Sequence, residues 1–130
     1  MIILTELVDV NFDLYSQNEE INIFAIGDIH LGNKNFDKKL FENTLKNIQN
    51  YNNYYLLLMG DLCEYITPKD PRFDVKCVEP EFIDPDNQYA AMRDYLEPFS
   101  DRIIGIHLGN HEYSIQKYHY KSITLDLCRN

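Results

Sequence analysis

Side chains that can bind a cation follow three apolar segments of this sequence. Each segment ends at a glycine, and a side chain bearing oxygen or nitrogen comes directly after it. The candidate ligands are Asp28, His30, Asp61, Asn110 and His111. Carboxylate and amide oxygens together with imidazoles suit divalent cations such as manganese, iron, zinc or magnesium. The sequence therefore predicts a metal site, if the fold brings these side chains together.

The three apolar segments are predicted to be parallel neighbours in one sheet. They cover residues 21–26, 54–59 and 102–108, and helical patterns at 36–49 and from Pro85 onward separate them. A strand–helix–strand unit makes a right-handed crossover between parallel strands. The prediction is an α/β fold, a mostly parallel sheet with flanking helices. Its carboxyl edge is where such sheets bind ligands, so the candidate ligands should converge there.

The helices carry their own start signals. Asn35 can cap the first helix, and Asp84 followed by proline begins the second. In the second helix an apolar stripe at helical spacing predicts core packing; it consists of Tyr89, Met92, Leu96 and Phe99. Ser122 is expected to cap a final short helix over residues 123–128.

The remaining segments carry weaker signals. Alternation over residues 8–14 predicts an edge strand, antiparallel to the first central strand. Residues 67–88 contain four prolines and read as a long loop, either walling the site or forming a surface insertion without a role. Residues 113–120 are polar and rich in tyrosine, and no helix is predicted there. His107 is expected to be packed in its strand, and His119 to be exposed.

Composition limits the function further. The 130 residues suffice for one domain, and 45% hydrophobic with 13% aromatic residues is typical of a folded protein. The net charge of -9 favours neither nucleic acid nor an anionic membrane, but it suits cations. No transmembrane run or signal peptide is recognisable. The three cysteines lack metal-binding spacing, so free thiols in a cytoplasmic protein are expected.

Three short motifs give a resemblance to a known family. They are Gly27-Asp28-Ile29-His30, Gly60-Asp61 and Gly109-Asn110-His111-Glu112. In order, spacing and strand-end placement they resemble the first three motifs of the calcineurin-like metallophosphoesterases. The segment Asp28-Ile29-His30-Leu31-Gly32 is also similar to the opening motif of the repair nucleases in this superfamily. The form Gly60-Asp61-Leu62-Cys63-Glu64, with its following loop and helix, resembles the phage-type branch.

The resemblance implies a hydrolase for phosphomonoesters or phosphodiesters, including nucleotides or nucleic acid, with two divalent cations that clamp the phosphate and activate a water. Asp61 would bridge the cations, Asp28 and His30 would bind one, and Asn110 the other. His111 would face the substrate as the catalytic residue, donating a hydrogen bond or a proton. Glu64 and Glu112 lie close by in sequence and are either support for a ligand or solvated carboxylates.

The family pattern is incomplete in this sequence. Its second half supplies an isolated histidine and a G-H-x-H motif, and no G-H-x-H occurs here. The chain is therefore predicted to be a single but incomplete domain over residues 1–130, resembling the first half of the family's αββα sandwich. A longer enzyme, a partner chain that brings the histidines, and a decayed single-metal remnant are the three explanations. An uncovered sheet would favour self-association.

Other readings stay open at this stage. Asp28 or Asp61 alone could cap a turn or helix, His30 could be a hydrogen-bonded loop histidine, and Asn110 could sit in a left-handed turn. The rival functions are a non-catalytic metal-binding or interaction module and a flavodoxin-like phosphate binder. The latter would present a Gly-rich loop to the phosphate, whereas Gly27–Gly32 presents a carboxylate.

Overall fold

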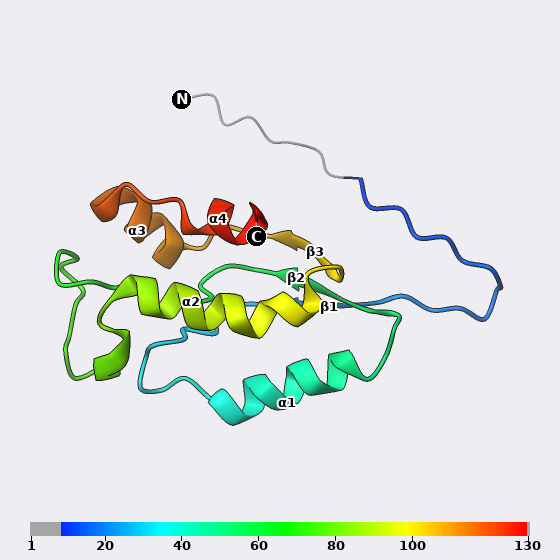
Figure 1. Cartoon of the computed structure of the whole chain (residues 1–130), viewed down its shortest axis with the longest axis horizontal. Coiled ribbons are helices and arrows are strands. Elements are labelled where there is room, and N and C mark those ends of the chain that lie inside the picture. The colour runs from blue at the N-terminus through cyan, green and yellow to red at the C-terminus, as the bar shows by residue number, and fades with distance from the viewer. Residues whose placement is uncertain (1–8, 130) are drawn as a thin grey trace.

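A computed structural model describes residues 9–129 and shows the predicted α/β fold (Figure 1). Three strands form one parallel sheet in the order β1-β2-β3: Asn22–Ile26, Tyr54–Leu58 and Ile103–Ile106. The helices are α1 Lys38–Gln49, α2 Pro85–Leu96, α3 Asn110–His119 and α4 Ile123–Arg129. Two single turns of 3-10 helix, η1 Pro80–Phe82 and η2 Glu97–Phe99, flank α2.

The crossover helices begin at aspartate caps. Asp37, not Asn35, caps α1, because its carboxylate accepts the N–H of Leu40 at 2.9 Å. Asn35 is instead part of a local turn in which its own N–H binds the side chain of Asn33. Asp84 caps α2 ahead of Pro85, as predicted.

One face of the sheet carries the hydrophobic core. On that face Leu56 and Leu58 are fully buried, and α1 and α2 pack over them. The two helices touch through the Phe41 and Tyr95 rings, whose centroids lie 5.2 Å apart. Consecutive right-handed crossovers place both helices on the same side of a sheet with this strand order, which explains the single core layer.

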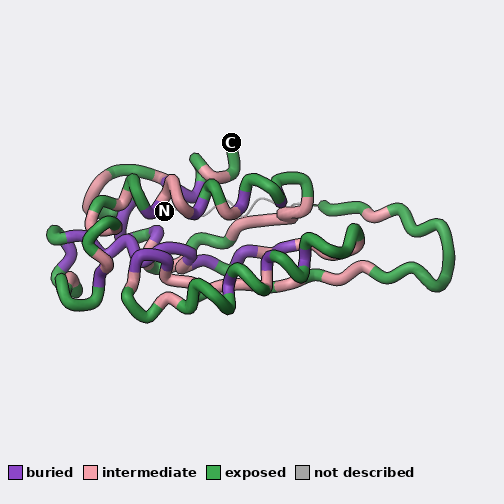
Figure 2. Tube along the Cα trace, turned by 60° about the horizontal axis from the view of Figure 1, so that its bottom comes forward, coloured by how far each residue is buried: buried purple, intermediate pink, exposed green. Residues whose placement is uncertain are grey.

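The opposite face is much more open. Ile23 of β1 is 51% exposed, and its neighbour in register, Tyr55, is only half-buried. Tyr55 meets the ring of Phe12, which belongs to an extended and mostly exposed amino-terminal arm (Figure 2). Residues 9–129 thus bury one face of the sheet and leave apolar side chains on the other.

Two expectations about local structure are wrong. Residues 9–14 form no strand and join no sheet of the described residues; residue 8 lies outside the described range. The polar stretch after Glu112 is helical, forming α3. Its apolar contacts are few, but Ser114 and Ile115 are buried, so tertiary packing rather than a regular stripe supports it.

The predicted loop over residues 67–88 ends earlier than expected, because residues 80–82 form η1 and α2 begins at Pro85. The part before η1 is tied into the domain. Asn33 bridges Val78, and Thr67 and Asp70 are buried.

The final helix α4 begins at Ile123, directly after Ser122, as predicted. All three cysteines are free thiols, which agrees with the sequence prediction. Within the described range, none of the helices combines the length and apolar character needed to cross a bilayer.

Candidate metal centre

The tips of the three strands meet because glycines let their backbones approach closely. A Cβ at Gly60, where φ is +87°, would lie 2.5 Å from the backbone nitrogen of Gly109. A Cβ at Gly109 would lie 2.3 Å from the Oδ1 atom of Asp61. Only glycine fits either position, so these residues allow the loop after β2 to lie directly against the loop after β3.

Backbone hydrogen bonds continue past the ends of the strands and bring the loops after β1 and β2 into register. The N–H of Asp28 donates to Gly60 at 3.1 Å, and the N–H of His30 donates to Asp61 at 3.1 Å. The side chains of the first two motifs are therefore held side by side by main-chain geometry.

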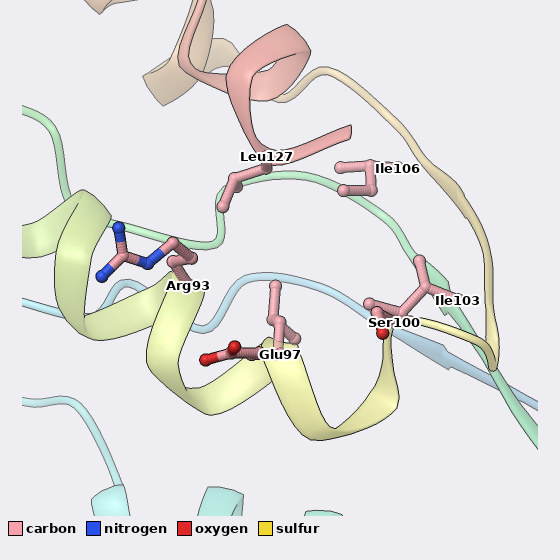
Figure 3. Close-up of a pocket in the computed structure, with 7 residues that line it drawn as sticks. Arg93, Glu97, Ser100, Ile103, Ile106 and Leu127 are labelled. Carbon is pink, nitrogen blue, oxygen red and sulfur yellow. The ribbon is translucent and has the colours of Figure 1, made fainter. Parts of the chain in front are cut away.

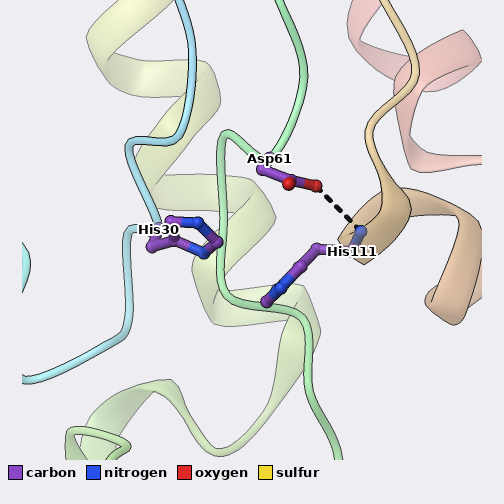
Figure 4. A group of neighbouring side chains, drawn as sticks. All are labelled: His30, Asp61 and His111. Atoms are coloured by element: carbon purple, nitrogen blue, oxygen red, sulfur yellow. Dashed lines mark hydrogen bonds between the residues drawn. The ribbon is translucent and has the colours of Figure 1, made fainter.

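His30, Asp61 and His111 form one cluster at this edge (Figure 4). Each offers a ligand atom, and the three atoms lie within 4.8 Å of one another. The Oδ1 atom of Asp61 also accepts the N–H of His111 at 2.9 Å, which anchors the start of α3. This cluster could hold a divalent cation, because two imidazoles and a carboxylate form a common ligand set for such ions.

The other two predicted ligands lie beside the cluster. The carboxylate of Asp28 is 85% exposed, and its Oδ1 atom lies 3.8 Å from Nε2 of His30, so it is outside the close group. The amide of Asn110 lies against Asp61. With its nitrogen turned toward that carboxylate, it donates at 3.2 Å to Oδ1 and 2.7 Å to Oδ2. The reverse orientation would point the amide oxygen at the same place, which suits a shared cation.

Three of these residues hold unusual backbone conformations. Asp28, His30 and Asp61 have φ values of 51°, 52° and 50°, in the left-handed region that non-glycine residues seldom adopt. Each costs on the order of 1 kcal/mol or more and persists only where surrounding structure enforces it. Asn110 is the first residue of α3 and is not left-handed, so the left-handed-turn reading of that residue is wrong.

Glu112 fixes the two loops on which Asp61 and Asn110 lie. Its carboxylate is buried and accepts three main-chain N–H groups, from Asp61 and Leu62 at 2.8 Å and from Gly109 at 3.0 Å. In the bond to Gly109, the side chain of the third residue of α3 accepts the N–H of the N-cap residue, as in a capping box. For Glu112 the predicted alternative of a solvated carboxylate is wrong, because the carboxylate is buried and holds the backbone of Asp61.

Glu64 is also buried, and it touches both histidines of the cluster. Its Oε2 atom lies 3.2 Å from Nδ1 of His30, and its carbonyl oxygen contacts Nδ1 of His111. The Glu64 carboxylate raises the pKa of His30, against the lowering effect of burial. Burial acts to raise the pKa of Glu64, but His30 and the charge of His111 outweigh it, so that pKa lies below its ordinary value.

A cavity of about 320 Å³ opens at the cluster. It is lined by the histidines and Glu64, with Asp28, Ile29, Asn33, Asn35 and Phe36 along the remaining wall. The lining contains ionisable, apolar and amide side chains, which is the composition expected of a small-molecule site.

A comparison with protein-family models identifies the family of this chain. The calcineurin-like phosphoesterase family model matches residues 21–128. The chain belongs to this family. No curated protein and no solved structure shows a significant match to the chain. The matched range includes all three strands and the cluster, so the phosphoesterase domain and the candidate metal centre coincide.

A second apolar-lined cavity lies away from the phosphoesterase cluster. It is a cavity of about 330 Å³ between α2, β3 and α4, lined by Leu96, Ile103, Ile106 and Leu127 (Figure 3). It contains no histidine, and its charged rim consists of Arg93 and Glu97. It therefore has the character of incomplete packing beside β3.

Several contacts of the described residues could not be predicted from local sequence patterns. His107 is exposed just after β3, so its predicted packing inside the strand is wrong. His119 is half-buried rather than exposed, because its Nε2 atom lies 2.7 Å from the hydroxyl of Thr67. Asp70 is buried beneath α3, where it accepts from Ser114 and pairs with Arg72. None of these residues belongs to a motif, so no local pattern indicates their partners.

Proposed function

We propose that this phosphoesterase domain hydrolyses phosphomonoesters or phosphodiesters with the help of two divalent cations. The observation that carries the proposal is the convergence of His30, Asp61 and His111 within 4.8 Å at the carboxyl edge of the sheet. Cations held there would supply charge neutralisation for the phosphate and an activated water. The residues assigned to hold them are Asp28, His30, Asp61 and Asn110.

His111 is assigned to the substrate. Its Nδ1 atom contacts a carbonyl oxygen, which can only accept, so in the neutral ring Nδ1 carries the proton and Nε2 is free. When protonated, Nε2 can donate to a phosphate oxygen or to the departing alkoxide. A positioned general acid contributes about 10²–10⁴-fold to the rate.

The test compares two histidine variants. H111A should lower turnover of a chromogenic phosphodiester by roughly 10²-fold or more while calorimetry with manganese keeps the wild-type stoichiometry. H107A is the matched control, because His107 is exposed and lies outside the cluster. Unchanged turnover in H111A would remove the catalytic assignment, and loss of manganese binding would make His111 a ligand instead.

A second candidate function has one observation in its favour. The described residues supply one close group of three ligands, fewer than two cations need. In that case the chain is a non-catalytic module with a single structural metal. One weak manganese site without turnover of any phosphate ester, even in excess metal, would support this candidate over the enzyme.

We further propose that other ligands complete the site. Two cations in this family require more imidazoles than residues 9–129 bring to the cluster, and the sheet leaves one apolar face open. The phage-type branch is proposed on the Gly60–Glu64 motif, and a nucleotide or nucleic-acid substrate on that motif together with Asp28–Gly32. The free thiols favour a reducing, cytoplasmic setting. An open reading frame encoding G-H-x-H downstream of the Asn130 codon would support a longer enzyme.

The open face is also the proposed surface for self-association with a second copy of the chain. Ile23 is 51% exposed there, and β3 pairs with β2 along only one of its edges. I23K should convert a concentration-dependent dimer into a monomer in sedimentation experiments. A wild-type chain that stays monomeric at high micromolar concentration would contradict the proposal.

A further inference from the structure

Glu64 lies between the two histidines of the cluster and contacts each through a different part of the residue. Its side-chain Oε2 atom is 3.2 Å from Nδ1 of His30, and its main-chain oxygen contacts Nδ1 of His111. The two rings themselves are 4.5 Å apart between centroids, at an interplanar angle of 76°. One residue is thus the nearest neighbour of the Nδ1 atom on both rings.

The surroundings of Glu64 explain why its carboxylate is there. The residue is 8% exposed, and a buried carboxylate requires partners. No lysine or arginine of the described chain forms an ion pair with it; its partners are the two histidines and Asn33. The carboxylate therefore serves the imidazoles and is not one half of a structural ion pair.

The backbone around Glu64 is held on both sides. Its N–H donates to Leu31 at 2.9 Å, which continues the pairing between the first two strand tips. The next residue, Tyr65, is left-handed at φ 48°, and its N–H donates to the side chain of Gln88 at 2.8 Å. Glu64 is consequently fixed relative to the loop that carries His30.

We infer that Glu64 is a positioning residue that sets the tautomer and orientation of both His30 and His111. A carboxylate and a carbonyl oxygen both accept, so each contact keeps a proton on Nδ1 and leaves Nε2 available to a cation or a substrate. The Nδ1 atom of His30 is buried and makes no aligned hydrogen bond to the described residues, and the Oε2 atom of Glu64 lies 3.2 Å from it. A buried polar atom requires a partner, and the Glu64 carboxylate is assigned that role.

The inference deepens the proposed function, and it rests on that function only for its effect on metal binding. A partner that holds the second nitrogen of a ligating histidine typically changes metal affinity by about 10–100-fold when it is removed. The tautomers, by contrast, can be read in the metal-free protein.

The experiment uses the whole chain with nitrogen-15-labelled histidine. Long-range proton–nitrogen correlation spectra, recorded where the rings are neutral, report which nitrogen carries the proton. In the wild type both rings should carry it on Nδ1. In E64A, His30 should lose that preference, whereas His111 should keep it because its partner is the main-chain oxygen of residue 64. His111 is therefore an internal control within the same spectrum.

Manganese calorimetry provides the second measurement. E64A should weaken binding by about 10–100-fold, and E64Q, which keeps an accepting oxygen, should weaken it less and preserve the His30 tautomer. E81A is the control, since Glu81 is exposed on η1. If E64A does not fold, E64M carries the test, because it keeps the length of the side chain and has no accepting oxygen.

Two results would overturn the inference. They are a wild-type His30 with its proton on Nε2, and a variant lacking the carboxylate in which the His30 tautomer and the manganese affinity are both unchanged. A wild-type chain that binds no manganese would instead overturn the proposed function, and the tautomer of His30 would still decide the role of Glu64.

Discussion

The clearest quantitative test of the architecture concerns Glu112, whose buried carboxylate holds the loops after β2 and β3 together. It accepts N–H groups from Asp61, Leu62 and Gly109 at 2.8, 2.8 and 3.0 Å. The perturbation is E112Q, which keeps the shape, removes the charge and replaces one accepting oxygen with an NH₂ group. That group must face a backbone N–H, so one buried donor loses its acceptor.

The magnitude follows from the three contacts. A hydrogen bond to a charged group contributes about 1.5–3 kcal/mol against about 0.5–1.5 for a neutral one, so two weakened bonds lose roughly 2 kcal/mol together. The unsatisfied donor adds roughly 1–3 kcal/mol. Relief from burying a charge offsets part of this. The expected loss in free energy of unfolding is therefore about 2–4 kcal/mol.

Urea denaturation followed by circular dichroism measures that loss. With an m value of about 1.5–2 kcal/mol per molar urea, the midpoint should fall by roughly 1–2.7 M. E81Q, an exposed control, should stay within about 0.5 kcal/mol of the wild type. Amide hydrogen exchange should accelerate at Asp61, Leu62 and Gly109 well before the rest of the domain. An unchanged midpoint together with unchanged exchange at these three amides would refute the role given to Glu112.

Three further predictions concern Gly109, Asp70 and the metal site. G109A should destabilise the domain by about 1–3 kcal/mol, because the new Cβ overlaps Asp61. G105A is the control and should be tolerated, because the atom nearest to its new Cβ lies 3.4 Å away. Thermal denaturation compares the two variants. Arg72 holds the pKa of the Asp70 carboxyl well below its usual range, so the stability that wild type has over D70N should be full above about pH 4 and shrink as the pH falls further; urea titrations from pH 7 to pH 3 measure it. Manganese at 100 times its dissociation constant should stabilise the folded chain by about 2.7 kcal/mol, and EDTA should reverse the shift; a melting temperature indifferent to both would contradict a metal site.

The sequence was a good guide wherever a signal is local. Three apolar runs, each followed by a glycine and separated by helical patterns, predicted three parallel neighbouring strands. The structure shows them in the order β1-β2-β3. The cap of α2 at Asp84 was readable for the same reason, because a capping residue acts on its own first turn. Placement of His30 and Asp61 at one sheet edge needed only the rule that parallel strands share a carboxyl edge.

Local signals failed where a segment is held by contacts from elsewhere. Residues 9–14 alternate like a strand, yet they pair with no strand of the described sheet, and alternation alone cannot supply a partner. The helix α3 lacks a clear apolar stripe but is anchored by Asp61 and Glu112 at its start. Its helical state is decided by capping groups, one of which is about fifty residues away in sequence.

What the sequence alone determined is the set of side chains at the strand ends, since carboxylates, imidazoles and an amide there are the donors that suit a divalent cation. What only the tertiary structure decided is how those groups are held. From sequence, Glu64 and Glu112 were either support for a ligand or solvated carboxylates, and only their burial against histidine rings and main-chain N–H groups decides between the two. The physical reason is that a buried carboxylate must find donors wherever the fold supplies them, and no short motif records which donors those are.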